Sequence, residues 1–418
     1  MSGPETGSAT VTRRRALRRR GPGLIALLAL VVAVGVYLPL TLATPLAPAA
    51  AETARYQAPQ ESSPALTFPP YGATAVKALG YEHSLTTSGD DEPRSIASIS
   101  KVVTALVVLE AKPLDGGDGP TITIDPAAAA LRAQYLQVDG KVAPMSVGQT
   151  FTERQMLEVA LIESANNYAG ALAQWAFGSD AAYAAAATTW LAENGLHATT
   201  IVEPTGLSAQ NTSTATDLVT LGTLALQNET VSAIVNTAST TVPGVGTIEN
   251  SNELLGLDGV KGIKTGTLDA AGACLLFAAD YRIADTTVTV VGVMLGGKDH
   301  PSLDADVQAL LGSVTKRFQT LTLTTRGSEF AHYDAPWGAS ANAVAAQDAS
   351  VLAWGDETVT ASITTDEVGS GARGATVGRV TFSIGDGQKA EVPLRLDRAL
   401  VEPDAWWRLT HPGVVLGG

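Results

Sequence analysis

The longest apolar stretch of the chain lies near its N-terminus, at residues 24–43. It reads LIALLALVVAVGVYLPLTLA, and no charged residue occurs between Arg20 and Glu52. About 20 apolar residues suffice to cross a bilayer as a helix, and a basic flank of this kind stays on the cytoplasmic side. Residues 1–50 are therefore predicted to be a basic N-terminus with a signal peptide or a membrane anchor, and the rest of the chain is predicted to be extracytoplasmic.

Helical periodicity dominates the middle of the chain. An apolar run with helical spacing covers residues 94–110, and Thr152 with Gln155 forms a capping box that opens a second helical region. Further helices are predicted in DAAYAAAATTWLAEN, which Gly195 ends, in TATDLVTLGTLALQN, and in a last helix that begins at Pro301.

Segments with the character of strands flank this helical region. Residues 74–89 predict a strand or hairpin, and residues 112–151 predict a stretch rich in glycine, proline and threonine with short strands such as TITI. Residues 259–297 predict three antiparallel strands with glycine-containing turns. A helical cluster combined with an antiparallel sheet that is completed late in the chain is an α+β fold.

Changes in composition divide the chain further. Residues 51–70 are rich in proline and alanine and predict an extended linker. From residue 328 onward the chain becomes a series of short alternating strands, such as GRVTFSIGDGQKAEVPLRL, which is typical of a small β-domain. A main domain at 71–327 and a C-terminal β-rich domain at 328–418 are therefore predicted, and two domains suit a chain of 418 residues.

Charge and cysteine content narrow the classes of partner and cofactor. The net charge is −14, and since six arginines and one glutamate before residue 23 contribute +5, the rest of the chain carries −19. Such an excess disfavours nucleic acid and anionic membrane surfaces as partners of the body of the protein. Cys274 is the one cysteine, so an intramolecular disulfide is excluded, and the five histidines lack metal-ligand spacing. Neither a metal nor an organic cofactor is predicted.

Two residues of the 94–110 helix carry candidate chemistry. Ser98 and Lys101 are three residues apart, so a helix places both side chains on one face. A serine hydroxyl needs a base to become a good nucleophile, and a lysine amine can be that base when burial lowers its pKa. An ordinary surface helix can contain the same pair, so the assignment depends on motifs downstream.

Two further motifs follow in order, Ser164 with Asn166 in LIESANNYAGALA and the K-T-G string at 264–266. The trio S-x-x-K, S-x-N and K-T-G is that of β-lactamases and penicillin-binding proteins. Together with IASISKVVTAL, EPTGLSAQNTSTATDL and GVKGIKTGTLDAAGACLLFAA, these strings resemble the D-alanyl-D-alanine carboxypeptidases of serine peptidase family S11, the low-molecular-mass penicillin-binding proteins. The resemblance covers about residues 70–320 and implies a penicillin-binding, β-lactamase-like transpeptidase fold.

The resemblance and the chemistry of the side chains give each residue an expected role. Ser98 attacks the carbonyl between two D-alanines and forms an acyl-enzyme, Lys101 is the general base, and Ser164 relays a proton to the leaving nitrogen. The expected substrate-binding residues are Asn166 for a peptide amide, Lys264 as a fixed positive charge and Thr265 as a hydrogen-bond donor for the terminal carboxylate, Gly266 for close approach of the substrate backbone, and Thr267, whose N–H forms an oxyanion hole with that of Ser98.

Three alternative functions would be compatible with the same fold and related residues. A class A β-lactamase adds a glutamate that activates water, but EPTGLS lacks the E-x-x-L-N pattern and matches the P-[ST]-G-L turn of carboxypeptidases, where Glu203 is a variable neighbour. A catalytically inactive muropeptide-binding relative would carry a broken motif, and none of the three is broken. Endopeptidase action on peptide crosslinks would use every residue named and stays open.

The sequence therefore predicts a serine-type D-Ala-D-Ala carboxypeptidase of the cell envelope, secreted or anchored to the membrane by its N-terminal segment. Its predicted substrate is a peptidoglycan stem peptide that ends in D-Ala-D-Ala, from which it removes the terminal D-alanine. β-Lactam antibiotics are its predicted covalent inhibitors, and nucleic acid is not a predicted partner.

Overall fold

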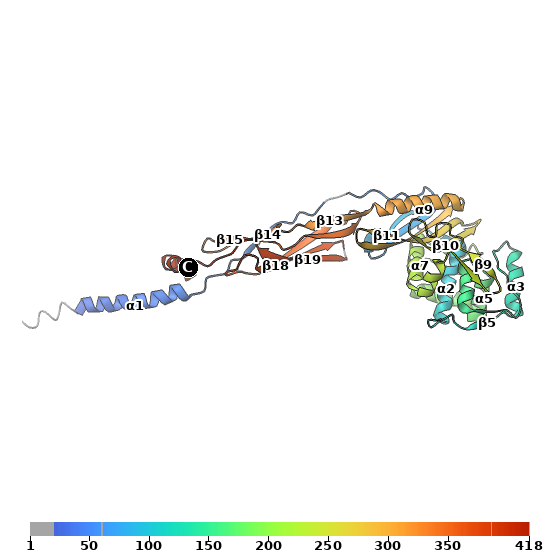
Figure 1. The fold of residues 1–418 in the computed structure, drawn as a ribbon, viewed down its shortest axis with the longest axis horizontal. Coiled ribbons are helices and arrows are strands. Elements are labelled where there is room, and N and C mark those ends of the chain that lie inside the picture. The colour runs from blue at the N-terminus through green and yellow to red at the C-terminus, as the bar shows by residue number, and fades with distance from the viewer. Residues whose placement is uncertain (1–20, 60–61, 386, 418) are drawn as a thin grey trace, which may run out of the picture.

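The protein is an elongated molecule with three parts in a row (Figure 1). The computed structural model describes residues 21–59, 62–385 and 387–417, so the basic segment predicted at the start of the chain lies outside the described residues. A long N-terminal helix forms one end, a β-rich unit lies in the middle, and a unit of mixed helices and strands forms the other end. The chain returns to the first end at its C-terminus.

Helix α1 (Gly21–Ala43) contains the long apolar stretch. Within the described part of the chain, its residues 22–43 form the one unbroken helix that is long and apolar enough to cross a membrane, and its most apolar window is not buried against the protein. At 1.5 Å per residue these 22 residues extend about 33 Å, close to the thickness of the hydrocarbon core of a bilayer.

The mixed unit is built on a five-stranded antiparallel sheet with the order β10-β11-β12-β2-β3. Its strands are β2 (Ala73–Ala78), β3 (Thr86–Gly89), β10 (Val260–Leu268), β11 (Gly272–Ile283) and β12 (Thr286–Gly297). The three consecutive strands predicted at 259–297 are confirmed, as is the hairpin predicted at 74–89. The early hairpin completes a sheet whose other strands come almost 200 residues later.

Helices cover both faces of this sheet. On one face lies α7 (Ala215–Gln227), in which Gly222 lies close to the Leu276 side chain. On the other lies α9 (His300–Thr315), whose buried side chains share a core with Leu275. Because successive strand residues point to opposite faces, β11 contributes to both cores and fixes the layers relative to each other.

The remaining helices cluster beside α7. They are η2 (Ala97–Ile99), α2 (Ser100–Ala111), α3 (Pro126–Leu136), α4 (Glu153–Leu161), α5 (Asn166–Phe177), α6 (Asp180–Glu193) and α8 (Glu229–Val235). A further 3₁₀ turn, η1 (Glu82–Ser84), lies between β2 and β3. Two short helices, α10 (Ala405–Thr410) and α11 (Pro412–Val415), follow the last strand of the chain. Short antiparallel pairs connect them: β4 (Arg94–Ser95) with β7 (Thr212–Ser213), β5 (Thr121–Thr123) with β6 (Thr150–Thr152), and β8 (Ser239–Val242) with β9 (Gly246–Glu249). The predicted capping box of Thr152 and Gln155 is present at the start of α4.

One helix contradicts the sequence prediction. Residues 112–151 were predicted to be a stretch rich in glycine, proline and threonine with short strands, but α3 occupies the middle of this stretch. Its start is well defined, since the Asp125 carboxylate accepts a hydrogen bond from Ala128 N at 2.8 Å and Pro126 stands in the first turn. The helix was not predicted, because the glycine and proline residues on either side of it favour turns.

The β-rich unit contains a six-stranded sheet, β1-β14-β15-β19-β18-β17, and a separate pair, β13 with β16. The strands are β1 (Ala51–Thr53), β13 (Phe318–Thr324), β14 (Glu329–Asp334), β15 (Ser340–Ala345), β16 (Ala349–Trp354), β17 (Val359–Thr365), β18 (Thr376–Ile384) and β19 (Gln388–Leu396). Strand β13 precedes the boundary predicted at residue 327 but pairs with β16 beyond it.

Part of the predicted linker is bound to this unit. Strand β1 pairs with β14, and the Tyr56 hydroxyl donates a hydrogen bond to Leu323 O at 3.1 Å. The Tyr56 ring also packs edge-on against Phe382, within the core of the β-rich unit. The chain that leaves α1 is therefore tied to the C-terminal sheet before it reaches the mixed unit.

Candidate active site

Ser98 and Lys101 meet at the start of α2. Ser98 lies in the 3₁₀ turn η2 that leads into the helix, and three residues per turn in a 3₁₀ helix place the two side chains one above the other. The Lys101 Nζ atom lies 2.9 Å from Ser98 Oγ. Ser98 is partly exposed, whereas Lys101 is only 1% exposed. A substrate can therefore reach the hydroxyl, while the amine is shielded from water.

The surroundings of Lys101 disfavour its charged form. Burial and the nearby Lys264 ammonium lower the pKa of Lys101 well below its ordinary value, although the Glu203 carboxylate acts in the opposite direction. Lys101 Nζ also donates a hydrogen bond to Thr205 O at 2.6 Å. An uncharged amine held by one acceptor, with its lone pair available toward a hydroxyl, is suited to act as a general base.

Strand β10 brings the K-T-G motif alongside this turn. Alternate strand residues share a face, so the Lys264 side chain lies on the same face of β10 as Gly266, which is the face that meets η2. A Cβ atom at Gly266 would lie 3.3 Å from Ser98 N and 3.0 Å from Ile96 O, so a side chain there would crowd the nucleophile turn. Lys264 is 2% exposed, and burial together with Lys141 lowers its pKa to about 7. The expected fixed positive charge is therefore only partial at neutral pH, and a bound carboxylate would favour it.

The two threonines of this strand have partners that the sequence did not indicate. Thr265 Oγ1 lies 2.6 Å from Ser251 Oγ and 3.5 Å from Lys264 Nζ. Thr267 is exposed, and its Oγ1 lies 2.8 Å from His300 Nε2 at the start of α9. Ser251 and His300 stand outside the three motifs, so their places near β10 emerge only from the fold.

Ser164 lies between α4 and α5, and Asn166 is the first residue of α5. Ser164 adopts a left-handed backbone with φ of 62°, which is uncommon for a residue with a side chain. Asn166 N donates to Lys141 O at 2.7 Å, and the Asn166 Oδ1 atom is buried without a hydrogen-bond partner among the described residues. Lys141 lowers the pKa of both Lys101 and Lys264, so the turn that contains Ser164 lies close to these two lysines. Within the described chain, no hydrogen bond joins Ser164 Oγ to Lys101 or Lys264.

The loop that contains the P-[ST]-G-L turn supports Lys101. The Glu203 carboxylate accepts hydrogen bonds from Thr205 N, Thr205 Oγ1, Gly206 N, Ser208 N and Asn211 Nδ2, at 2.7 to 3.2 Å. These bonds fold the loop back on itself and present Thr205 O to Lys101. In this chain Glu203 therefore lies at the centre of the hydrogen bonds of the loop. Its position just before several turn N–H groups is a local signal of this role.

Comparisons with known proteins agree with this geometry. A family model described as D-alanyl-D-alanine carboxypeptidase, peptidase family S11, matches residues 82–298, just over half of the chain. The chain is 32% identical over 253 residues to a D-alanyl-D-alanine endopeptidase of Escherichia coli, covering 57% of this chain and 75% of that protein. It is 30% identical over 266 residues to a D-alanyl-D-alanine carboxypeptidase of Streptomyces sp. (strain K15), covering 59% and 88% respectively.

Two solved structures show the same fold. The Streptomyces K15 DD-transpeptidase matches with a TM-score of 0.53 at 26% identity, over 60% of this chain and 98% of that chain. Penicillin binding protein 5 of Haemophilus influenzae matches with a TM-score of 0.57 at 20% identity, over 82% of this chain and 100% of that chain. The expected transpeptidase-like fold with a C-terminal β-rich part is confirmed. Since the family model spans more than half of the chain and the relatives share the same class of activity, this chain belongs to the D-alanyl-D-alanine carboxypeptidase family of serine peptidases, which act on peptidoglycan.

Proposed function

We propose that the protein is a D,D-carboxypeptidase that removes the terminal D-alanine from peptidoglycan stem peptides through an acyl-enzyme on Ser98. The observation that carries this proposal is the 2.9 Å contact between the accessible Ser98 hydroxyl and the buried Lys101 amine. No other part of the site needs to supply a base, because the lowered pKa of Lys101 leaves its amine free to accept a proton.

Acylation begins when the Lys101 amine takes the Ser98 proton while Oγ bonds to the carbonyl carbon between the two D-alanines. The carbonyl electron pair moves to oxygen, where the N–H groups of Ser98 and Thr267 stabilise it. Collapse of this intermediate breaks the C–N bond, and the leaving nitrogen takes the proton from Lys101 through Ser164. Water then attacks the ester with Lys101 again as base, and Ser98 leaves with its proton restored.

The terminal carboxylate of the peptide is assigned to Lys264 and Thr265. The pKa of Lys264 lies at about 7 in the free protein, and a carboxylate beside it favours the charged form. Gly266 keeps β10 close to the Ser98 turn, since a Cβ atom there would lie 3.3 Å from Ser98 N, and the carboxylate site on this strand therefore stays beside the nucleophile. The Asn166 Oδ1 atom, to which no described residue donates a hydrogen bond, offers an acceptor to a peptide bond of the substrate, and the Asn166 NH₂ group offers a donor.

Glu203 is a positioning residue in this scheme, and its engagement argues against a class A β-lactamase. In that class a glutamate must activate the deacylating water. Here both carboxylate oxygens of Glu203 already accept hydrogen bonds from its own loop. The site therefore lacks the additional base of that class, and we expect penicillin to stay attached to Ser98 and not to be turned over rapidly.

Endopeptidase action is the second candidate, because the Escherichia coli relative at 32% identity is a D-alanyl-D-alanine endopeptidase. Purified protein should be given a stem peptide that ends in D-Ala-D-Ala and, separately, a crosslinked muropeptide dimer, with products followed by mass spectrometry. Release of free D-alanine, abolished in Ser98→Ala, supports the carboxypeptidase. Cleavage of the dimer without release of D-alanine supports the endopeptidase, and D-alanine release by Ser98→Ala contradicts the assignment of the nucleophile.

We also propose that α1 stays attached and anchors the protein in the membrane with the body outside the cytoplasm. The small residues after α1 that could form a cleavage site are part of the folded β-rich unit. Ala49 is buried and exchanges two backbone hydrogen bonds with Val368, at 2.8 and 3.0 Å, and β1 begins at Ala51. Cleavage at this point would remove backbone pairing that the sheet uses.

A further inference from the structure

Lys141 and Glu163 form an ion pair at the edge of the active site that the proposed catalysis does not use. Lys141 Nζ lies 3.3 Å from Glu163 Oε1, and the two side chains are 50% and 26% exposed. Burial is the main cause of the low pKa of Lys264, the Lys141 charge adds to it, and the Glu163 charge opposes it. Both charged groups are therefore close to Lys264, where the terminal carboxylate is assigned, and both can be reached by a substrate.

The backbone on both sides of Lys141 is fixed to the start of α5. Lys141 O accepts the hydrogen bond from Asn166 N at 2.7 Å. Two residues further on, the backbone N–H and carbonyl of Ala143 both bond to the buried side chain of Asn167, each at 3.0 Å. On the other side, a Cβ atom at Gly140 would lie only 2.7 Å from Asn166 Nδ2. The Lys141 side chain therefore starts from a defined position beside Asn166.

Glu163 is placed by the same turn that places Ser164. It stands directly before Ser164 in the connection from α4 to α5, and the turn is closed by a hydrogen bond of 3.3 Å from Ala165 N to Val159 O. An exposed ion pair contributes only about 0–1 kcal/mol to stability. The stability of the fold therefore gives little reason for two ordered opposite charges at this edge, and recognition of a charged substrate group gives a better one.

The places assigned to the substrate bring its third residue to this ion pair. The acyl part of the stem peptide consists of the penultimate D-alanine and, before it, the third residue. The bond that joins these two is the first peptide bond beyond the scissile one, and Asn166 is the residue assigned to such a bond. The third residue is commonly a diamino acid, whose side chain ends either in an amine alone, as in lysine, or in an amine and a carboxylate, as in meso-diaminopimelic acid.

We propose that Lys141 and Glu163 make the enzyme specific for stem peptides whose third residue ends in both an amine and a carboxylate. This inference rests on the proposed carboxypeptidase function. Glu163 accepts hydrogen bonds from the substrate ammonium and Lys141 donates to the substrate carboxylate, so one ion pair is exchanged for two. A lysine at the third position would occupy Glu163 and leave the Lys141 charge beside Lys264 without a partner. The preference follows from this difference between the two substrates.

The test uses synthetic pentapeptides that end in D-Ala-D-Ala and differ only at the third residue. D-Alanine release by the full chain gives kcat/KM for each peptide. We expect the meso-diaminopimelic acid peptide to be preferred over the lysine peptide by roughly tenfold, as for one charge-assisted hydrogen bond. A meso-diaminopimelic acid peptide whose side-chain carboxylate is amidated has nearly the same shape without that charge, and should react like the lysine peptide.

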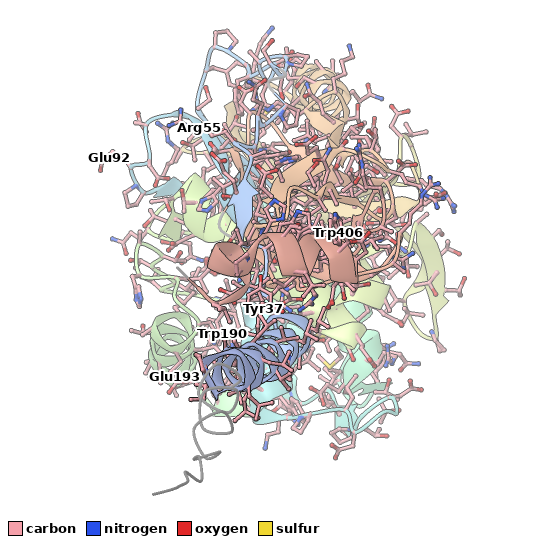
Figure 2. The ribbon with its side chains drawn as sticks, turned by 90° about the vertical axis from the view of Figure 1, so that its left-hand side faces the viewer. Tyr37, Arg55, Glu92, Trp190, Glu193 and Trp406 are labelled. Atoms are coloured by element: carbon pink, nitrogen blue, oxygen red, sulfur yellow. The ribbon has the colours of Figure 1, made fainter. Side chains whose placement is uncertain are left out.

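Two substitutions assign the preference to the ion pair. Lys141→Met should make the two peptides react equally. Glu163→Gln should slow both of them relative to a norleucine peptide, whose third residue carries neither charge. The matched controls are Lys316→Met at the end of α9 and Glu193→Gln on α6, both exposed, and both should keep the preference. Glu193 is labelled in Figure 2.

The ratio between peptides is the decisive quantity, because Lys141→Met also removes a charge close to Lys101 and Lys264. A change in either of these lysines affects all peptides alike, and acylation by benzylpenicillin, which has no third residue, measures it separately.

Each outcome decides the proposal. Equal kcat/KM for the lysine and meso-diaminopimelic acid peptides, or a preference for lysine, overturns the inference and leaves the carboxypeptidase function intact. A preference that survives Lys141→Met also overturns it, because another group then recognises the carboxylate. Glu163→Gln that slows the norleucine peptide equally overturns the part of Glu163. Release of D-alanine from none of the peptides overturns the proposed function, and the inference with it.

Discussion

Two buried lysines set the chemistry of the site. The Ser98–Lys101 spacing is local, so the sequence was sufficient to predict that these side chains share a face. The low pKa of Lys264 was not predictable, because it depends on burial under the helical cluster and on Lys141, more than 100 residues away in the chain. The part that Glu203 plays in its loop was not predicted, since it depends on hydrogen bonds that lie outside the three motifs, most of them from backbone N–H groups.

Substitution of Glu203 tests its positioning role. Glu203→Ala removes the acceptor that folds the loop, so we expect acylation of Ser98 by a β-lactam to slow by roughly 100-fold, and Glu203→Gln by about tenfold, as expected for loss of charge-assisted hydrogen bonds. The Glu203 charge raises the pKa of Lys101, so Glu203→Gln should also move the acidic limb of the acylation rate to lower pH. Stopped-flow acylation between pH 5 and 9 measures both effects.

Glu110→Gln is the matched control for this experiment, because Glu110 is an exposed glutamate on the same helix as Lys101. It should leave the acylation rate and its pH profile unchanged. A Glu203→Ala variant that acylates at the unaltered rate would show that Thr205 O is held without Glu203.

Glu153 makes the free energy of unfolding depend on pH. Its side chain is fully buried, neither carboxylate oxygen has a hydrogen-bond partner among the described residues, and burial raises its pKa to about 7. A raised pKa in the folded state means that stability is greatest below pH 4.5 and declines as pH rises toward 7. Glu153→Gln should therefore raise the free energy of unfolding at pH 8 by about 3 kcal/mol and change it little at pH 4.

Urea unfolding at the two pH values measures this difference, with the exposed Glu193→Gln on α6 as the control that should show none. Equal effects of Glu153→Gln at both pH values would mean that the carboxylate is not the source of the pH dependence.

At the scale of elements, the site is a junction between one helix start, one strand and one loop. Long elements with a clear hydrophobic period were predictable from the sequence. The capping box of α4 was predictable as well, because its two residues lie within one helical turn. The α3 helix was missed because its flanks are rich in glycine and proline. The approach of β10 to η2 and of the 203–211 loop to both is a tertiary contact, for which the sequence offered only the order of the motifs.

Gly206 holds the loop against the nucleophile turn. It has φ of +84°, and a Cβ atom there would clash with Ala97 O directly before Ser98. Gly206→Ala should destabilise the protein by about 3 kcal/mol and slow acylation of Ser98, because either the loop or the turn has to move. Gly195, with φ of +77° and open space around it, is the matched control.

Gly195→Ala carries only the cost of a left-handed backbone, about 1 kcal/mol, and should leave acylation unchanged. Thermal unfolding and acylation rates of the two variants separate backbone strain from the clash. Equal behaviour of the two would contradict the proposed contact between the loop and the turn.

At the scale of the whole molecule, the segment that follows α1 joins the C-terminal β-rich unit. The five-stranded sheet, the helical layers and the β-rich unit were predictable as classes of structure, but the pairing of β1 with β14 joins residues almost 280 positions apart and has no sequence signature. The predicted linker therefore contains an edge strand of the C-terminal sheet. The β-rich unit thus lies between α1 and the peptidase unit (Figure 1).

Removal of N-terminal residues tests this arrangement. A chain that starts at residue 44 keeps Ala49, β1 and Tyr56, and should unfold at the same denaturant concentration as the full chain. A chain that starts at residue 59 loses them and should be less stable by about 3 kcal/mol or more, given the buried aromatic side chain alone. Tyr56→Phe in the longer chain removes only the hydroxyl and should cost about 1 kcal/mol. Equal unfolding of the two truncated chains would mean that the segment after α1 is not part of the sheet.

The most direct test of the proposed catalysis by Ser98 and Lys101 is mass spectrometry of the peptide that contains Ser98, after exposure of the active protein to benzylpenicillin. We predict one penicilloyl group on Ser98, which should be absent in Ser98→Ala. The group should form far more slowly in Lys101→Met, which keeps the bulk of the side chain but has no amine. A protein that releases D-alanine yet carries no adduct, or carries it on Ser164, would contradict the claim that a neutral Lys101 activates Ser98.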